Sequence, residues 1–392
     1  VPMMKELNPE VLGIKPSGIR KFFDLVSEMK DAISLGVGEP DFETPWHIRE
    51  EGIHSLEQGR TFYSSNAGLM ELRNAISDKV REEHGITYHA KEEVMVTVGG
   101  SEAIDLAMRV ILTPGDEVLI PEPCYVSYLP CAKMAYGVPV PIQLEEKDEF
   151  RLTPEKLEKA ITEKTKLLVL PFPNNPTGGI MEERDLEAIV PIILKHNLYV
   201  LTDEIYSALS YKGKHHSIIE FPGMRERTVY INGFSKAYAM TGWRLGYACA
   251  EERILKQMLK LHQFAIMCAP TTSQYSAVEA LRNGDADVRK MRDAYDERRR
   301  FLVYHLRKMG LDCFEPYGAF YVFPSIRKFG LSSEEFAEKL LKEEKVAVVP
   351  GNAFGASGEG FIRISYAYSL DNLKKAMERM ERFIKSLEKS GE

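Results

Sequence analysis

Apolar residues form short continuous runs between about residues 94 and 250, and these runs alternate with windows in which apolar residues recur at helical spacing. Continuous runs are typical of strands that are buried on both faces. Their alternation with helices favours a mostly parallel sheet joined by helical crossovers. The pattern therefore predicts an α/β domain, with expected strands at residues 94–98, 117–121, 166–171, 198–203, 228–233 and 244–250.

Beyond residue 310 the pattern changes to isolated apolar runs between helical windows, at residues 319–324, 346–350 and 361–367. This change predicts a second, smaller α+β domain. A packed helix face is expected from Leu373, Met377, Met380, Ile384 and Leu387, which are spaced by three and four. We expect a large domain of residues 46–285 and a small domain of residues 1–45 and 286–392, with the joint in the helical region 251–309.

Two local signals predict where helices begin. Thr153-Pro154 precedes a window that places Leu157 and Ile161 on one face. Residues 332–335 have the spacing of a capping box, in which two side chains accept hydrogen bonds from each other's backbone N–H groups. Both segments are therefore expected to open helices.

Composition narrows the possible partners. The chain has 392 residues, of which 44% are hydrophobic and 28% charged, as in ordinary globular proteins. Its net charge of −7 would repel nucleic-acid backbones and anionic membranes, so we expect neither as a partner. The run DAYDERRR at residues 293–300 mixes signs at helical spacing and indicates a solvated helix face.

The cysteines and the N-terminus bear on the compartment. Five widely spaced cysteines without a CxxC pair indicate neither a disulfide framework nor a zinc site, and we expect no metal. A reducing cytoplasm is the expected location. The first ten residues lack the apolar core of a secretory signal, and no run of 18 apolar residues predicts a membrane span.

The strand expected at residues 94–98 ends in Gly99-Gly100, and Ser101 is the expected N-cap of the next helix. Two glycines let a ligand approach the backbone, and free amides at a helix N-terminus attract an anion such as phosphate. More often, however, a strand followed by two glycines and a helix is only a tight turn that binds no ligand.

Two further strand ends carry polar residues. The segment PFPNNPTGG contains Asn175, whose amide can donate a hydrogen bond, and the Asn175–Pro176 bond is a candidate cis peptide. Asp203 stands where another strand ends, and Tyr206 follows three residues later. A buried carboxylate needs a cationic partner, which a cofactor could supply. The alternatives are that the segment PFPNNPTGG is a turn that binds no ligand, and that Asp203 caps a helix or lies at the surface.

The stretch NGFSKAYAMTGWRLGY, residues 232–247, contains Lys236 and Arg244 but no carboxylate. Burial lowers the pKa of a lysine, and a neutral amine forms imines with aldehydes. An arginine stays charged, and its planar fork suits phosphate. The alternatives are that Lys236 is an exposed lysine on a surface helix and that Arg244 forms a structural ion pair with a distant carboxylate. Together the four strand ends offer a binding site for phosphate, a hydrogen-bond donor for a phenolate oxygen, a carboxylate and a lysine. Pyridoxal phosphate requires all four groups.

The sequence resembles the class I aminotransferases of the fold-type I pyridoxal-phosphate superfamily from about residue 33 to 367. Residues 233–246, GFSKAYAMTGWRLG, fit the lysine signature of that family at every position. The resemblance implies pyridoxal 5'-phosphate as cofactor and an α/β fold with a large, mostly parallel sheet domain and a smaller α+β domain. It also implies that Lys236 holds the cofactor as an imine and moves the proton at the substrate Cα.

The same resemblance implies roles for other residues. Asp203 would pair with the pyridine nitrogen, while Tyr206 and Asn175 would bond the phenolic oxygen of the ring. Tyr125 would stack on the ring face. The phosphate would be held by Gly100, Ser101, Ser235 and Arg244.

Three residues outside this group complete the implied site. Tyr63 corresponds to a tyrosine that reaches the phosphate across a dimer interface, so the resemblance implies a homodimer with shared sites. Arg363 corresponds to the arginine that grips the substrate α-carboxylate in a bidentate pair. Gly38 corresponds to a glycine in the N-terminal segment that closes over the substrate.

Three departures from the family concern the phosphate and the substrate. Gly233 stands where many members carry a hydroxyl on the phosphate. Residues 261–272 contain no arginine for a distal carboxylate, and Ser101 stands where another branch has a lysine. These departures favour aromatic or other large neutral amino acids as substrates, and they leave aspartate-like substrates possible.

We therefore expect a cytoplasmic, homodimeric aminotransferase that moves an amino group from an L-amino acid to a 2-oxo acid, with 2-oxoglutarate as the expected acceptor. A carbon–sulfur β-lyase with the same residues stays open. So does an N-acetyl-diaminopimelate aminotransferase, whose subgroup shares the segments SGIRKF, NAGLMELR and GAFYVFPSI. A cofactor-binding transcription regulator is not expected, because residues before 33 leave no room for a winged-helix module.

Overall fold

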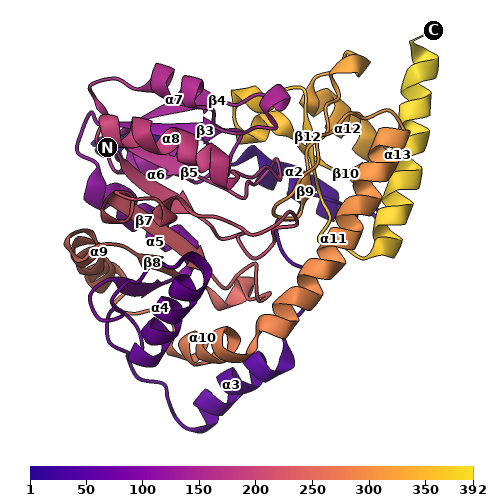
Figure 1. Cartoon of the computed structure of the whole chain (residues 1–392). Coiled ribbons are helices and arrows are strands. Elements are labelled where there is room, and N and C mark those ends of the chain that lie inside the picture. Colours follow the sequence, from indigo (N-terminus) through magenta and orange to yellow (C-terminus); the bar gives the residue numbers. More distant parts are fainter. Residues whose placement is uncertain (392) are drawn as a thin grey trace.

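A seven-stranded sheet organises the larger part of the chain (Figure 1), in a computed structural model that describes residues 1–391, without the side chains of residues 18 and 21. The strand order is β2-β8-β7-β6-β5-β3-β4, with the pairs from β7 to β4 parallel and β8 antiparallel to both neighbours. The strands are β2 (Val94–Thr97), β3 (Glu117–Glu122), β4 (Val138–Gln143), β5 (Thr165–Leu170), β6 (Tyr199–Asp203), β7 (Thr228–Gly233) and β8 (Gly246–Cys249).

The predicted α/β fold with a mostly parallel sheet is confirmed, and all six expected strands are present. The sequence analysis missed β4, whose residues VPVPIQ include two prolines. Proline cannot donate a hydrogen bond to a strand ladder, so it is tolerated in an edge strand such as this one.

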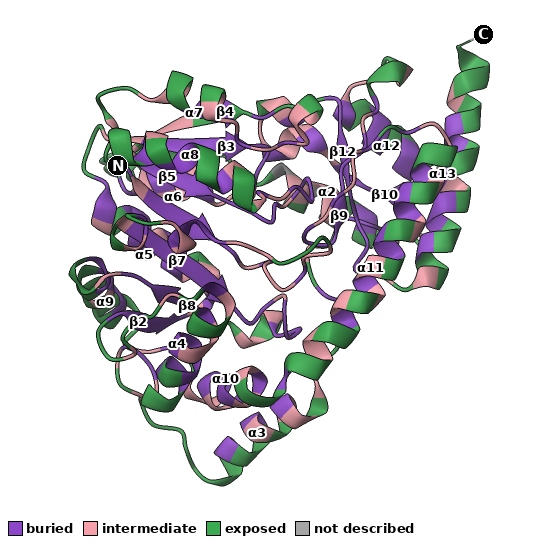
Figure 2. Cartoon of the chain, in the orientation of Figure 1, coloured by how far each residue is buried: buried purple, intermediate pink, exposed green. Residues whose placement is uncertain are grey.

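Apolar side chains on the two faces of the sheet pack against different helices. On one face, Val118, Leu167 and Val229 join residues of α5 (Gly99–Ile111), α6 (Tyr128–Met134) and α9 (Glu252–Ala265). Residues one position along, such as Leu119 and Leu168, join α4 (Met70–His84) and α8 (Glu183–Lys195) on the other face. Burial on both faces explains why these strands read as continuous apolar runs (Figure 2).

The C-terminal part has its own small sheets and helices. Strands β11 (Val349–Pro350), β12 (Ile362–Ser365) and β9 (Tyr321–Val322) form an antiparallel sheet, and β1 (Ile33–Ser34) pairs with β10 (Val346–Ala347). Helices α12 (Ser333–Glu344) and α13 (Leu370–Ser390) pack beside them. The remaining helices are α1 (Pro9–Leu12), α2 (Gly18–Ser27), α3 (Trp46–Glu57), α7 (Pro154–Ala160), α10 (Thr271–Asn283) and α11 (Asp285–Lys308).

The predicted helix details are largely confirmed. Thr153 caps α7, and Ser332 and Glu335 form the capping box of α12. Four of the five expected apolar residues of α13 are buried, and Leu387 packs against the same core at partial exposure. No helix in the described part of the chain is both long and apolar enough to cross a bilayer.

The solvated helix face expected at residues 293–300 is wrong in part. These residues lie in α11, as expected, but Arg298 and Arg299 are buried. Arg298 donates hydrogen bonds to both carboxylate oxygens of Asp41, and Arg299 bonds Glu315. Partners distant in sequence therefore turn part of this charged run inward.

Strand β8 approaches the start of α5 so closely that only glycine fits at the contact. A Cβ on Gly246 would lie 2.6 Å from the backbone nitrogen of Gly100 and 2.7 Å from the carbonyl carbon of Gly99. Both neighbours are backbone atoms, which cannot move aside without shifting the helix. The position of the α5 N-terminus therefore depends on this glycine.

We expect Gly246→Ala to lower the free energy of unfolding of the apoprotein by about 1–3 kcal/mol, because the added methyl overpacks a backbone contact. Gly242→Ala is the matched control, since a Cβ there meets no atom within 4 Å. Urea unfolding of both variants beside the parent chain checks this, and equal midpoints for all three would contradict it.

Candidate active site

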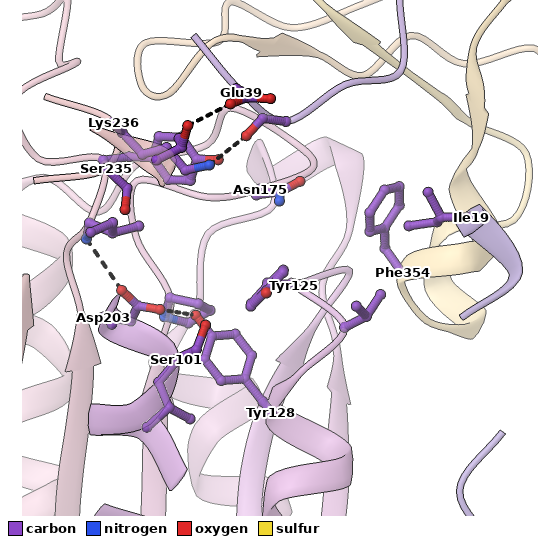
Figure 3. Close-up of a pocket in the computed structure, with 18 of the residues that line it drawn as sticks. Ile19, Glu39, Ser101, Tyr125, Tyr128, Asn175, Asp203, Ser235, Lys236 and Phe354 are labelled. Atoms are coloured by element: carbon purple, nitrogen blue, oxygen red, sulfur yellow. Dashed lines mark hydrogen bonds between the residues drawn. The ribbon is translucent and has the colours of Figure 1, made fainter. Parts of the chain in front are cut away.

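A cavity of about 500 Å³ opens where the parallel strands end, and it gathers residues from distant parts of the chain (Figure 3). Ligands of open α/β sheets bind at this edge. Eleven of the twelve predicted site residues line the cavity, namely Gly38, Gly100, Ser101, Tyr125, Asn175, Asp203, Tyr206, Ser235, Lys236, Arg244 and Arg363.

Lys236 follows the carboxyl end of β7, and its Nζ donates a hydrogen bond to the carbonyl oxygen of Gly38. Burial lowers the pKa of Lys236 to about 8, and the positive charges of Arg363 and Arg244 act in the same direction, against Glu39 and Asp203. The expected lowering of this pKa by burial is confirmed. About a tenth of the amine is therefore neutral and nucleophilic at pH 7, and about half at pH 8.

Asp203 is the last residue of β6 and is buried. Its Oδ2 accepts a hydrogen bond of 2.6 Å from the Tyr128 hydroxyl, and its Oδ1 accepts one from the backbone N–H of Ile205. Burial raises the pKa of Asp203, although the bond from Tyr128 opposes the rise. A cationic ligand group at this carboxylate would offset the cost of burying its charge.

The anion cradle differs in one respect from the sequence prediction. Helix α5 begins at Gly99 rather than after Ser101, so the expected N-cap role of Ser101 is wrong. The side chain of Glu102 instead accepts a hydrogen bond from the backbone N–H of Val98. Ser101 therefore lies inside the first turn, with its hydroxyl at the cavity.

Arg244 lies directly over the start of α5. It adopts a positive φ of 52°, and its Nη1 donates to the carbonyl oxygen of Thr241. Gly99 has a positive φ of 70°, which favours glycine, and a Cβ there would lie 2.5 Å from the Arg244 Nη2 atom, so a side chain would displace the guanidinium. The helix N-terminus, Ser101, Ser235 and this arginine together form a site suited to a phosphate.

The glycine at position 233 has a structural reason. A Cβ there would lie 2.9 Å from Cδ1 of Ile205 and 3.0 Å from Cα of Gly246. The packing of Ile205 and β8 therefore leaves little room for any side chain at this position.

Arg363 enters the cavity from β12 in the C-terminal part of the chain and is buried. Its Nη1 donates to Oδ1 of Asn175 at 2.7 Å, and its Nη2 donates to the carbonyl oxygen of Gly36. The rings of Tyr321 and Phe354 lie 4.5 and 4.9 Å from its guanidinium carbon. Its Nε is buried without a partner among the described residues, and each Nη atom keeps a second N–H that a substrate carboxylate could accept from.

Asn175 precedes a cis proline, as expected from the sequence. Because its Oδ1 accepts from Arg363, its amide nitrogen is the atom left to donate into the cavity. Tyr206 is buried, and its hydroxyl lies 2.7 Å from that of Tyr321. Both side chains can therefore offer hydrogen bonds to an oxygen bound beside them.

Tyr63 is the one predicted site residue that is not part of the cavity lining described for this chain. Its side chain is 79% exposed, and the neighbouring Phe62 is 80% exposed. Two adjacent aromatic side chains pointing to solvent are consistent with a contact to another chain.

Two tyrosines and an apolar wall belong to the site but were not predicted from the sequence. Tyr128 bonds Asp203, and Tyr321 bonds Tyr206. A tyrosine in sequence is as often a core residue, so only the proximity of Tyr128 to Tyr125 could have pointed to it. The wall is formed by Ile19, Phe23, Val126 and Phe354, which come from three segments far apart in the chain.

These residues fit pyridoxal phosphate. A phosphate can bind at the α5 N-terminus, a protonated ring nitrogen can face the buried Asp203, and an aldehyde can reach an amine whose pKa is already lowered. The guanidinium of Arg363, which lines the same cavity, offers a second anion site for the carboxylate of a substrate.

Comparisons with known proteins agree with this geometry. The family model for aminotransferase class I and II matches residues 30–380. The aspartate aminotransferase of Pyrococcus abyssi is 46% identical over 95% of this chain and 96% of its own length. The aromatic-amino-acid aminotransferase 2 of Thermococcus litoralis is 45% identical over the same shares. The crystal structure of an aromatic aminotransferase from Pyrococcus horikoshii superposes with a TM-score of 0.90 at 45% identity, covering 94% of this chain and 99% of that one. This chain therefore belongs to the class I and II aminotransferases, and it is a pyridoxal-phosphate-dependent enzyme that transfers amino groups of amino acids.

Proposed function

We propose that this aminotransferase takes aromatic or other large apolar L-amino acids as amino donors. The apolar wall of Ile19, Phe23, Val126 and Phe354 carries this proposal, because it lines the same cavity as Arg363. A substrate held by its α-carboxylate at Arg363 would project its side chain against these residues. We further propose 2-oxoglutarate as the acceptor, since the glutamate pair is the common carrier of amino groups, and the cytoplasm as the location.

The residues of the cavity divide the work between binding and proton transfer. Bound pyridoxal phosphate supplies an aldehyde and a ring that withdraws electrons from the substrate. Arg363 would bind the α-carboxylate, and Asp203 would keep a proton on the ring nitrogen. Lys236 would carry the proton to and from the substrate Cα, since its pKa of about 8 lies near the working pH.

The other residues of the cavity would fix the ring. Asn175 and Tyr206 would bond the phenolic oxygen, and Tyr125 would lie against the ring face. Gly38, whose carbonyl oxygen accepts from Lys236, would lie over the substrate in the N-terminal segment. Gly100, Ser101, Ser235 and Arg244 would hold the phosphate.

We also propose a homodimer in which Tyr63 completes the phosphate site of the partner subunit. The exposure of Phe62 and Tyr63, and their absence from the lining of the cavity in their own chain, support this. The division into a large domain of residues 46–285 and a small domain of residues 1–45 and 286–392 is likewise a proposal.

The donor class is tested by half-reactions without an acceptor. We expect phenylalanine, tyrosine and tryptophan to convert the bound cofactor to its amino form, followed by absorbance, with larger kcat/KM than aspartate. A flat response to every amino acid would sink the proposal. Release of pyruvate and ammonia from a cysteine conjugate without any 2-oxo acid would instead assign a carbon–sulfur β-lyase.

The apolar wall is tested separately by Phe23→Ala. We expect kcat/KM for phenylalanine to fall about 10-fold or more, and that for aspartate to fall less, because the lost contact concerns only a large side chain. Leu25→Ala is the control, since Leu25 lies on the same helix with 51% exposure and outside the cavity lining. An equal loss for both substrates would contradict the assigned wall.

The charge state of Lys236 predicts a pH dependence. In the apoprotein, covalent capture of pyridoxal phosphate should speed up as pH rises through about 8, because only the neutral amine reacts. Removal of a nearby cation in Arg363→Gln should raise the pKa of Lys236 and move this midpoint upward. Borohydride reduction and mass spectrometry at timed intervals measure the attachment. An unchanged midpoint in the variant would refute the assigned coupling.

The shared site is tested with hybrid dimers of one Lys236→Ala chain and one Tyr63→Phe chain. If Tyr63 acts across the interface, one of the two sites in the hybrid retains both residues and binds cofactor with parental affinity. Fluorescence titration of the purified hybrid measures this. If no site of parental affinity forms in the hybrid, Tyr63 acts within its own chain. Parental affinity in the Tyr63→Phe homodimer would show that Tyr63 does not act at all.

A further inference from the structure

Three side chains from distant segments converge outside the catalytic cavity. His84 ends α4, Glu204 directly follows β6, and His215 lies in the segment between β6 and the short helix at Ile218–Glu220. The side chains of His84 and Glu204 are 1% and 2% exposed, and that of His215 is 16% exposed. Two imidazoles and a carboxylate are the donor set of many zinc sites.

The spacing of these side chains suits a small cation. One ligand atom of each residue lies within 4.8 Å of the ligand atoms of the other two. A point therefore exists within about 2.8 Å of all three atoms, because 4.8 Å divided by the square root of three gives that radius. Zinc ligands lie at about 2.0–2.2 Å, so each atom would have to move by less than about 1 Å.

His84 is oriented as a ligand. Its Nδ1 lies 2.6 Å from Oε2 of Glu220, while its Nε2 is buried and has no hydrogen-bond partner in the described part of the chain. A buried polar atom without a partner is costly, and a bound cation would remove that cost. A carboxylate on the other ring nitrogen is the usual support of a metal-bound histidine, since it fixes the ring and its tautomer.

Glu204 is held in the same manner. Its Oε1 lies 2.6 Å from Nε2 of His215, and its Oε2 accepts hydrogen bonds from the hydroxyls of Thr202 and Ser217. The carboxylates of Glu204 and Glu220 carry the two negative charges that a buried dication requires. The cluster thus contains three side chains that can bind a metal, the groups that hold these side chains in place, and two negative charges that would balance a dication.

We propose that His84, Glu204 and His215 bind one divalent cation of the zinc type. An adjoining cavity of about 20 Å³, lined in part by Glu204, His215 and His216, has room for one water molecule as a further ligand. It is too small for a substrate, so the site is structural. It fastens the end of α4 to the segment that follows Asp203, and it leaves that carboxylate itself to the catalytic cavity.

Cobalt is the probe, because Co²⁺ replaces Zn²⁺ in such sites and absorbs in the visible range, away from the cofactor. The holoenzyme without a histidine tag is stripped with a chelator, titrated with Co²⁺ and followed between 500 and 650 nm. We expect saturation at one Co²⁺ per chain and complete displacement by one equivalent of Zn²⁺. Zn²⁺ should also raise the Tm of the stripped enzyme. If no saturable cobalt signal is seen, the proposal is overturned, and the three side chains form only a hydrogen-bonded cluster.

Four variants locate the site. His84→Gln and His215→Gln should each abolish the cobalt signal, and two separate ligand variants guard against misfolding of either. Glu220→Gln should weaken binding about 10–100-fold, as expected for loss of a supporting carboxylate. His47→Gln is the matched control, because His47 also lies between two carboxylates, Glu279 and Asp287, but outside the cluster. Equal signals in His84→Gln and the parent enzyme would show surface binding and overturn the proposal.

Discussion

The active-site cavity gathers three basic side chains beside two carboxylates, those of Asp203 and Glu39. Lys236, Arg244 and Arg363 face one space, and the charges of the two arginines help burial to lower the pKa of Lys236. Like charges in a partly buried cavity repel, and anionic ligands reduce that repulsion. Phosphate at the α5 N-terminus and a carboxylate at Arg363 would each do so. Ligand binding and the pKa of Lys236 are therefore coupled through charge.

The hydrophobic pattern was sufficient to predict the central sheet because its strands are buried on both faces. The edge strand β4 was missed, since its prolines read as loop residues. The charged run in α11 was misread, because Asp41 and Glu315 are invisible to any local pattern. Local signals therefore succeed where neighbours in sequence decide the structure, and they fail where distant partners do.

The same limit applies to the catalytic site. The motifs around Lys236 and Asp203 were readable because cofactor chemistry needs particular residue types at strand ends. Tyr128 and Tyr321 were not readable, since their roles arise only from contacts with Asp203 and Tyr206. The cluster of His84, Glu204 and His215 shows the limit most clearly, because no spacing motif joins residues about 120 positions apart. The count and spacing of the cysteines, on which the expectation of no metal rested, carry no information about this cluster.

The packing around Gly233 bears on how related enzymes can diverge. Because Cδ1 of Ile205 occupies the space that a side chain at position 233 would need, the two positions are not independent. A hydroxyl-bearing residue at position 233 would require Ile205 to move or to be smaller, and its Cβ would still crowd the backbone at Gly246. The packing against β8, and not phosphate affinity alone, therefore limits which residue this position can carry. Ile205 also lines the active-site cavity, so one side chain both limits position 233 and forms part of the surface of the cofactor site.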